Sequence, residues 1–545
     1  MSLRASCFVL VASASLLVSA CGPTPALPGP VLETPDAGVG SPKSAWPLPN
    51  HQEWLTFFGF AAGSQLDVDG LDANAANEVY GGGYVRGSML VTDLAVDGTT
   101  RTHTLTAGTG KDLLLFKLSS SGGVLWTQLI PSTGVEGNAY DVVVDPVDDV
   151  VYSSGSFSGT LRLGDQLSLS SGCDEGSTGD NAYGQMLLLK HDRHGALLWS
   201  AQSKSSGLAA GGNEVALDRD RNVIQSGTAG ASPACTGAPT LSIGGFEIPT
   251  DGQADAWATV FDRTTGAPLF APIRVGGSGF QRAQAVDDGS LATGARSLVL
   301  GVSYKGPTVL YSRTRPEVRL GTSADRNDWD MVVAKYDYQG ELLWHRAFGS
   351  PTVVVTQGTL VQEQVKGVGV DSRGDVLVSG TLTGPVTIDG VTYSPERLSP
   401  RARTMGFVAK LASADGALIW FRPFTAETGV NTCCELAVDE NDVTSVTPQL
   451  YGSTLFVDGQ APRSLDNGGA EKLGVILRFD RDGVAQPVRS LATFVTPTTA
   501  TTTSELAVMP GNIVFWTGTI SGSLVGLPPY DSGTLTHDVV GRFQF

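Results

Sequence analysis

Three aspartates in one short segment come nearest to a metal-binding motif. Asp67, Asp69 and Asp72 surround Gly70, and calcium prefers several carboxylate oxygens supplied by one loop. The spacing departs from a calcium loop, because Gly70 is fourth and not sixth when counting starts at Asp67, and Gln65 stands where a further acidic ligand is needed. No complete metal motif is therefore predicted, and calcium is retained as a candidate cofactor at these three residues.

Motifs for catalysis are also incomplete. The six histidines form no H-E-x-x-H pair, and no G-x-S-x-G elbow occurs. His191 and His194 are three residues apart in an expected hairpin, which places them on opposite faces of a strand and argues against a shared metal. We therefore predict no catalytic residue and a non-enzymatic protein. The alternative is an enzyme, such as a hydrolase, lyase or quinone dehydrogenase, whose site converges from distant segments in a central channel.

The N-terminal twenty residues are typical of an export signal. Arg4 precedes an apolar run over residues 8–20 that is too short to cross a bilayer. The end of this run, Leu17 to Cys21, resembles the bacterial lipobox, which predicts a signal peptide over 1–20 and acylation of Cys21, for example with palmitate. Gly22, in place of the Asp that favours inner-membrane retention, points to an outer-membrane lipoprotein, either periplasmic or exposed at the cell surface.

The segment that follows is predicted to be a spacer. Residues 22–50 contain eight prolines, and such segments favour extended, semi-rigid conformations. The predicted organisation is therefore a signal peptide (1–20), a lipidated Cys and Pro-rich linker (21–50) and one folded domain (51–545).

Four cysteines remain once Cys7 is assigned to the signal and Cys21 to the lipid. An even number outside the cytoplasm suggests disulfides. Cys173 and Cys235 lie in equivalent loops of adjacent repeats, so they are a candidate disulfide between neighbours. Cys433 and Cys434 are a candidate vicinal pair, with a reduced state as the alternative.

A hairpin signature recurs through the folded domain. Each copy has an apolar strand, a turn glycine and then an apolar pair whose second residue lies four positions after the glycine. With Trp54 included, these anchors are Trp54, Trp126, Trp199, Phe270, Trp344, Trp420 and Pro487, with a mean spacing of about 72 residues. The Trp and Leu of each pair are predicted to be core residues that pack neighbouring units together. Asp112, Asp255, Asp330 and Asp538 open the strand before the hairpin and are predicted to accept hydrogen bonds from loop N–H groups.

Two further elements complete each repeat. One is a pair of apolar strands, such as Val142 to Gly155, and the other is a short hairpin with Gly at its tip, such as Leu241 to Gly244. Each unit thus supplies at least four strands and no periodic helix. The last unit lacks its outer strand and residues 53–58 are an outer strand without a unit. We therefore predict an all-β, seven-bladed β-propeller closed by pairing this N-terminal strand with the C-terminal blade.

The Lys-Leu-Asp-like strand, hairpin Gly and Leu-Trp pair resemble the repeats of bacterial surface β-propeller proteins, many of them lipoproteins. The resemblance covers residues 52–545 and is weakest after Trp420, since Pro487 replaces the aromatic residue. It implies a surface location and a binding or scaffolding role.

Charge and composition exclude one class of binding partner. The formal charge of −18 and the absence of a Lys/Arg cluster argue against nucleic acid as a partner. We expect a monomer held on a membrane by its lipid, which binds an unknown protein or glycan through the long connections 128–140, 170–184, 229–256, 302–330 and 350–366. A calcium-stabilised adhesin is a further alternative.

Overall fold

The computed structural model describes the chain from Gln52 onward, with gaps. The described residues are 52–60, 64–94, 100–108, 110–134, 136–163, 167–171, 184–205, 208–231, 240–251, 253–290, 294–321, 329–349, 363–432, 435–465, 472–490, 500–501, 505–521 and 536–545. The predicted signal peptide, Cys21, the Pro-rich linker, and the cysteines Cys173, Cys235, Cys433 and Cys434 lie outside them. The chain divides into two units between Pro42 and Lys43, and all the described residues lie in the second one. All that follows concerns the second unit.

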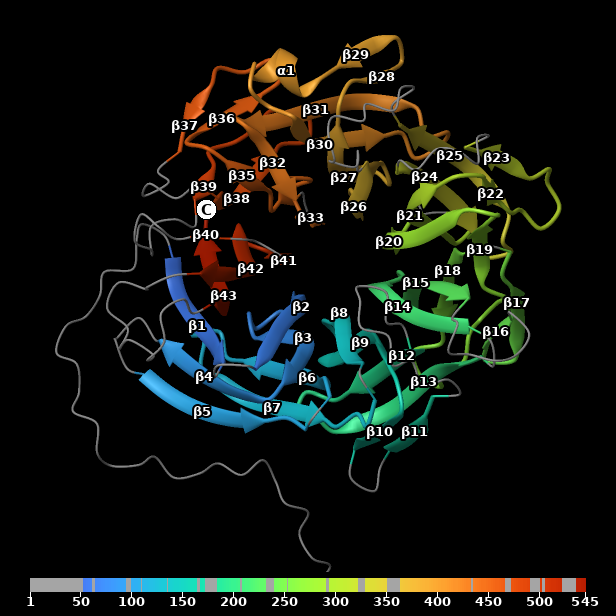
Figure 1. The fold of residues 1–545 in the computed structure, drawn as a ribbon, viewed down its shortest axis with the longest axis vertical. Coiled ribbons are helices and arrows are strands. Elements are labelled where there is room, and N and C mark those ends of the chain that lie inside the picture. Colours follow the sequence, from blue (N-terminus) through green and yellow to red (C-terminus); the bar gives the residue numbers. More distant parts are fainter. Residues whose placement is uncertain are drawn as a thin grey trace, which may run out of the picture. The chain divides into compact units, whose positions relative to one another are not determined.

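This part of the chain is all-β (Figure 1). Its strands pair into antiparallel meanders of four, which we call units 1 to 7 in chain order. The first strands, called inner strands below, are β2 (Gln65–Ala73), β8 (Gly137–Asp145), β14 (Leu208–Leu217), β20 (Phe280–Asp288), β26 (Gln364–Val370), β33 (Leu436–Val438) and β41 (Leu506–Met509). They pair in the same order with β3 (Val79–Arg86), β9 (Val150–Phe157), β15 (Val223–Ala231), β21 (Ser297–Lys305), β27 (Val376–Thr383), β34 (Thr444–Val446) and β42 (Ile513–Ser521).

The outer half of each unit repeats the same order. The third strands are β6 (Asp112–Leu118), β12 (Gln185–His191), β18 (Ala254–Phe261), β24 (Asp330–Asp337), β30 (Thr404–Leu411), β38 (Lys472–Phe479) and β43 (Thr536–Gln544). The fourth are β7 (Val124–Ile130), β13 (Leu197–Ser205), β19 (Ile273–Gly276), β25 (Leu342–Phe348), β31 (Leu418–Ala426), β39 (Arg489–Ser490) and, for unit 7, β1 (Gln52–Phe60).

The two ends of this unit of the chain lie in one sheet. β1 pairs antiparallel with β43, with Trp54 opposite Arg542 and Phe58 opposite Asp538. The segment that was predicted to pair with the C-terminal strand therefore does so. Neighbouring inner strands also contact one another in order, and β41 contacts β2, so their contacts form a closed circuit.

The apolar core is divided between units. Each apolar cluster of the described residues combines side chains from two successive units, and one of them joins Phe515 and Val540 of unit 7 to Val68 and Leu114 of unit 1. No unit therefore has a complete core of its own, and the packing of neighbours supplies it.

Tryptophans of the fourth strands join five of the units to the next. The indole N–H donates to a backbone carbonyl in the hairpin of the following unit in five pairs: Trp54 to Ser120 (2.8 Å), Trp126 to Arg193 (3.0 Å), Trp199 to Arg263 (3.1 Å), Trp344 to Ser413 (2.9 Å) and Trp420 to Arg481 (3.1 Å). The predicted packing role of these aromatic residues is confirmed.

The hairpin glycine is required by both backbone and packing. Gly122 has φ of 83°, a conformation that L-residues adopt only with strain. A Cβ at this position would lie 2.6 Å from the ring of Trp54. The tryptophan of one unit thus packs directly on the turn of the next.

The leucine before each tryptophan is not a core residue, and this prediction was wrong. Leu125, Leu198 and Ile419 are exposed by 50, 52 and 50%. Successive side chains of a strand point to opposite faces. Because the tryptophan faces the neighbouring unit, the residue before it faces solvent.

Short hairpins connect the second and third strands of units 1 to 6, and four of them extend the sheet of the preceding unit. They are β4 (Ser88–Leu94) with β5 (Thr100–Thr106), β10 (Thr160–Leu163) with β11 (Leu167–Ser170), β16 (Thr240–Ile243) with β17 (Phe246–Pro249), β22 (Thr308–Leu310) with β23 (Val318–Leu320), β28 (Val386–Ile388) with β29 (Val391–Tyr393), and β36 (Thr454–Val457) with β37 (Arg463–Ser464). In four cases the hairpin pairs with the fourth strand of the unit before it: β4 with β1, β16 with β13, β22 with β19 and β36 with β31.

The remaining elements are short. β32 (Gly429–Thr432) pairs with β35 (Gln449–Tyr451), and β40 (Ala500–Thr501) pairs with β42. The one helix of the described residues is α1 (Pro395–Leu398). Within the described residues, no helix is long and apolar enough to cross a membrane.

Candidate functional site

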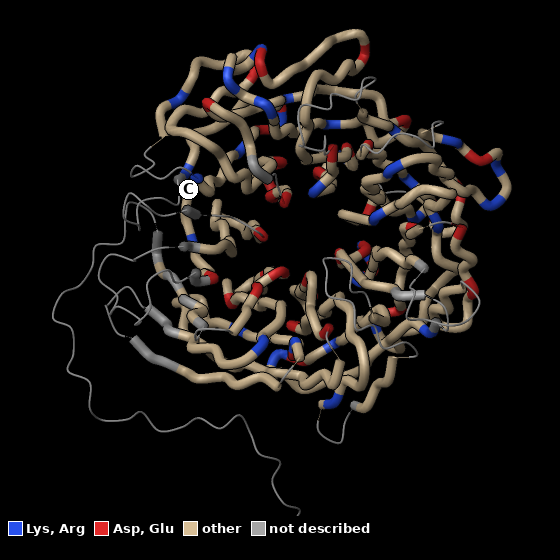
Figure 2. The backbone as a smooth tube through the Cα atoms, in the orientation of Figure 1, with Lys and Arg blue, Asp and Glu red and all other residues tan. Residues whose placement is uncertain are grey.

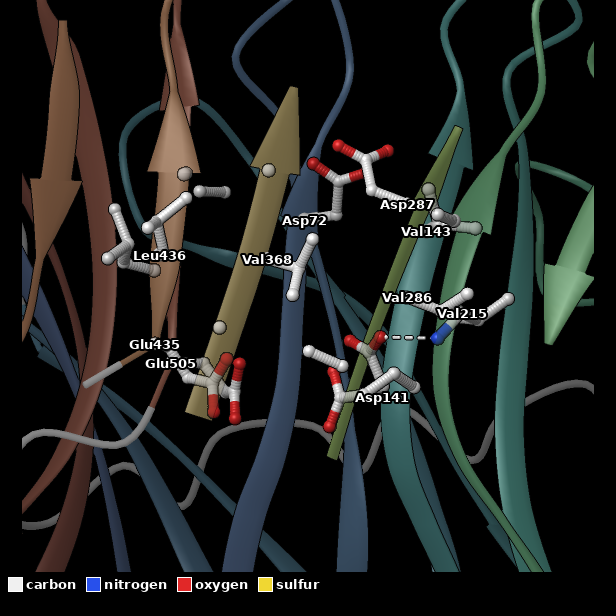
Figure 3. Close-up of a pocket in the computed structure, with 18 of the residues that line it drawn as sticks. Asp72, Asp141, Val143, Val215, Val286, Asp287, Val368, Glu435, Leu436 and Glu505 are labelled. Atoms are coloured by element: carbon white, nitrogen blue, oxygen red, sulfur yellow. Dashed lines mark hydrogen bonds between the residues drawn. The ribbon is translucent and has the colours of Figure 1, made fainter. Parts of the chain in front are cut away.

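A pocket lies between the seven inner strands. Its volume is about 400 Å³, and every inner strand, with the residue just before β33 and β41, contributes to its lining. We call it the central pocket. Figure 1 shows the inner strands around a common space, and Figure 3 shows the side chains that line it. Residues far apart in the sequence therefore meet here.

Backbone bulges recur in the inner strands. The pairing register shifts between Val68 and Gly70 in β2, and between Ala139 and Asp141 in β8. Equivalent shifts occur in β14, β20 and β26. A bulge inserts one residue and re-aims the side chains beside it. The position just after the bulge therefore has a defined place in units 1 to 5, and the residues directly before β33 and β41 correspond to it in the repeat.

This position carries carboxylates in four units. Asp141 follows the bulge of β8, Glu214 lies in the bulge region of β14, and Glu435 and Glu505 directly precede β33 and β41. All four line the central pocket. Figure 3 places Asp141, Glu435 and Glu505 at the same end of it. We call this set the carboxylate mouth.

Burial makes these carboxyl groups hold protons more strongly than usual. Desolvation is the main cause that raises the pKa of Asp141 to about 7 and that of Glu435 to about 8. The pKa values of Glu214 and Glu505 are also raised, by desolvation first and then by neighbouring carboxylates of the mouth. Asp141 keeps partial stabilisation of its charged form, since it accepts a hydrogen bond from the Val215 N–H at 2.8 Å.

Two further aspartates lie at the other end of the pocket. Figure 3 shows Asp72 and Asp287 there, away from the carboxylate mouth. Burial raises the pKa of Asp72 to about 6 and that of Asp287 to about 7. Asp72 accepts a hydrogen bond from the Val144 N–H at 2.7 Å. Both ends of the pocket are thus acidic, and Figure 2 shows acidic residues gathered on the inner strands.

The candidate calcium ligands do not form a loop. Asp67, Asp69 and Asp72 all lie on strand β2. The carboxylate of Asp69 accepts a hydrogen bond from the Asn138 amide at 2.8 Å, while Asp72 lines the pocket. Among the described residues, no group of three His, Cys, Asp or Glu side chains is arranged to hold a metal ion.

The two histidines lie in different surroundings, His191 at the end of strand β12 and His194 in the turn that follows it, not on opposite faces of one strand. His191 is fully buried, and burial lowers its pKa to about 4. His194 lies in the exposed hairpin, where its Nε2 accepts a hydrogen bond from the Arg193 Nε–H at 3.0 Å. No histidine is among the residues that line the central pocket.

The aspartates that open the third strands bind loop backbone where their contacts are described. Asp112 accepts hydrogen bonds from the N–H groups of Gly108 (2.9 Å) and Ser132 (3.2 Å). Asp255 accepts one from Asp251 N–H (3.2 Å) and pairs with Arg274. For these two residues the predicted loop-binding role is confirmed. Asp538 instead accepts from the hydroxyl of Thr519.

The carboxylate mouth was missed at the level of sequence, although a signal exists. An acidic residue directly precedes the repeated apolar strand in Asp141-Val142, Glu214-Val215, Glu435-Leu436 and Glu505-Leu506. These acids are 70 or more residues apart, so no linear motif joins them. Aligning the repeats and comparing one position across units would have revealed them.

Comparisons with known proteins add little. No protein-family model matches the chain, and no curated protein matches it. A solved structure of a member of the DUF4221 family from Bacteroides vulgatus is similar to it at 9% sequence identity and a TM-score of 0.29, covering 91% of this chain and 98% of that one. A likeness at this level supports neither a shared fold nor a shared function.

Proposed function

We propose that the protein is a lipid-anchored, seven-bladed β-propeller of the cell envelope that binds a positively charged ligand in its central pocket. Three observations support the propeller: the repeated four-stranded units, the closed circuit of inner-strand contacts, and the pairing of β1 with β43. Pairing of the two chain ends removes the free sheet edges that an open array leaves.

The acidity of the pocket lining carries the ligand proposal. Six lining residues are Asp or Glu, and none is Lys, Arg or His. A concave site lined by one sign of charge attracts the opposite charge. A cation in the pocket offsets the mutual repulsion of the carboxylates, and the raised pKa values show how strongly they resist ionisation without one.

We propose binding in preference to catalysis because of the residue types that line the central pocket. The lining contains carboxyl groups and aliphatic residues, without a Ser, Cys, Lys or His that could act as a nucleophile. One observation favours an enzyme as the second candidate. Carboxyl groups with pKa values near neutrality, such as Asp141 and Glu435, can act as general acids.

Calorimetric titration of 1,5-diaminopentane into the protein tests the binding proposal. We expect saturable binding that Glu435→Gln together with Glu505→Gln weakens by about tenfold or more, because each lost charge-assisted contact is worth more than 1 kcal/mol. Glu247→Gln, at an exposed position of β17, is the control with the same chemical change. Equal affinity in the double variant and the control would exclude the pocket as the site.

Anchoring is tested separately at Cys21. In a Gram-negative host fed an alkynyl palmitate analogue, we expect the full chain to be labelled and to fractionate with membranes. Cys21→Ala should abolish the label, since this thiol is the predicted acylation site, whereas Cys7→Ala should retain it. Labelling of the Cys21→Ala variant would contradict the anchor.

A further inference from the structure

Two basic side chains stand beside the carboxylate mouth. Lys366 is the bulged residue of β26, between Val365 and Gly367, and Gly367 lines the central pocket. Arg282 lies on the neighbouring inner strand β20. Lys366 interacts electrostatically with Arg282 and also with Glu435, Glu214 and Glu505. The end of the pocket that is lined by acidic side chains of units 2, 3, 6 and 7 therefore has basic side chains of units 4 and 5 next to it.

Neither basic side chain is neutralised within the described part of the chain. No ion pair there includes Lys366 or Arg282, although many other Lys and Arg residues are paired. The Nε–H of Arg282 is buried and has no hydrogen-bond partner. Two neighbouring cations that are partly withdrawn from water, and that no carboxylate pairs directly, are costly to the fold.

The nearby carboxylates do not remove this cost. Burial and the like charge of Arg282 lower the pKa of Lys366, and they outweigh the opposing effect of Glu435, Glu214 and Glu505. The surroundings of Lys366 thus disfavour its charge. A basic side chain that stands beside a pocket without an ion-pair partner is available to an anionic group of a ligand.

We propose that the central pocket binds a small zwitterion, an ω-amino acid or a short peptide, with its ammonium group at Glu214, Glu435 and Glu505 and its carboxylate at Arg282 and Lys366. This inference rests on the proposed function, because the ammonium group occupies the acidic site described there. It adds the second, anionic end of the ligand and the residues that select it. Guanidinium and ammonium groups together are suited to bind a carboxylate.

Calorimetry on matched ligands tests the inference. The probes are ω-amino acids from 3-aminopropanoate to 8-aminooctanoate, glycine oligomers of similar span, and the diamines and monocarboxylates of equal length. We expect one zwitterion to bind about tenfold or more tightly than its matched diamine and monocarboxylate. Stronger binding of the glycine oligomer identifies a peptide, and stronger binding of the aliphatic chain identifies an amino acid. Lys366→Met should remove the preference for the zwitterion and leave diamine binding intact.

The outcomes separate the two proposals. Equal binding of diamine and zwitterion overturns the inference and leaves the cation-binding function standing. Binding of neither class overturns both.

A second measurement needs no ligand. If Lys366 is an unpaired cation, Lys366→Met should raise the Tm of the free protein, whereas Lys204→Met, at an exposed position of β13, should leave it unchanged. A fall in Tm for Lys366→Met shows that Lys366 neutralises the carboxylate mouth as a structural residue, and this result overturns the inference.

Discussion

We call the hairpins and fourth strands of the units the outer wall, and the inner strands around the central pocket the inner wall. The residues of the outer wall are similar from unit to unit, whereas those of the inner wall vary. On the outer wall the same residues recur, since a tryptophan of one unit donates to the hairpin of the next in five pairs. On the inner wall the position after the bulge differs between units, being Gly70, Asp141, Ala285 or Gly367 in four of them. Repetition on the outside maintains the packing between units. Variation on the inside is thereby permitted, and it gives the pocket its uneven charge.

The largest expected effect is at the outer wall. Trp54→Ala removes a buried indole and its hydrogen bond to Ser120, so we expect a loss of about 3–5 kcal/mol in the free energy of unfolding, measured with urea. Leu198→Ala, at the exposed position before the tryptophan in the fourth strand of unit 2, should change it by about 0.5 kcal/mol or less. Similar losses for the two variants would contradict the division into packed and exposed faces.

His191 is an exception within the outer half of the units. Both of its ring nitrogens are buried without a hydrogen-bond partner, and Leu118, Tyr336, Leu411 and Phe479 occupy the equivalent positions. Its folded pKa of about 4 lies below the ordinary 6.5. Its neutral form therefore supports the fold above pH 6.5, and this support is lost as the pH falls towards 4. His191→Leu should be the more stable protein by about 3 kcal/mol at pH 4, with a smaller gain at pH 7. Parallel pH profiles of the two proteins would disprove this.

The hairpin glycines provide a matched pair. Gly122 and Gly340 have nearly equal φ, 83° and 81°, but a Cβ at Gly122 meets the Trp54 ring whereas one at Gly340 meets nothing within 4 Å. Both alanine variants should lose about 1–2 kcal/mol to backbone strain. Gly122→Ala should lose about 2 kcal/mol more to overpacking. Equal losses in chemical denaturation would mean that the tryptophan does not constrain the turn.

The inner wall should respond to pH with a smaller effect. The folded pKa of Glu435, about 8, lies above its ordinary 4.5, so its contribution is fully present below pH 4.5 and is lost as the pH rises to 8. Glu435→Gln imitates the protonated form. It should exceed the wild type in stability by about 1–2 kcal/mol at pH 8 and equal it at pH 4, a gain smaller than the full pKa shift would give because the Glu435 side chain is partly exposed to solvent. Glu247→Gln should follow the wild-type profile, and a gain that does not vary with pH would exclude this cause.

Features set by local chemistry could be predicted from the sequence. The spacing of about 72 residues identified the repeats, and Gly122 marked a turn because the backbone there needs a positive φ. The incomplete units at the two ends indicated that β1 pairs with β43. Each of these follows from a residue type at a fixed distance from another.

Features that depend on the contacts between units could not be predicted from the sequence in the same way. The attachment of β16 to β13 of the preceding unit depends on how far a hairpin reaches in space, and its residues look like those of any short hairpin. The core assignment of Leu198 failed because the period of two was not applied to the Leu-Trp pair. Glu214, Glu435 and Glu505 meet only after the units are placed beside one another.

The position of β1 has a consequence for how the protein folds. This strand lies between β43 on one side and β4 on the other, with Trp54 and Phe58 buried. During synthesis it emerges first among the described strands, yet one of its two partners is the last. Its pairing with β43 must therefore form after the rest of the domain has been synthesised, and this pairing is expected to be the slow, last step of folding. Truncation of β43 would leave β1 with one unpaired edge, and an exposed edge of this kind promotes aggregation.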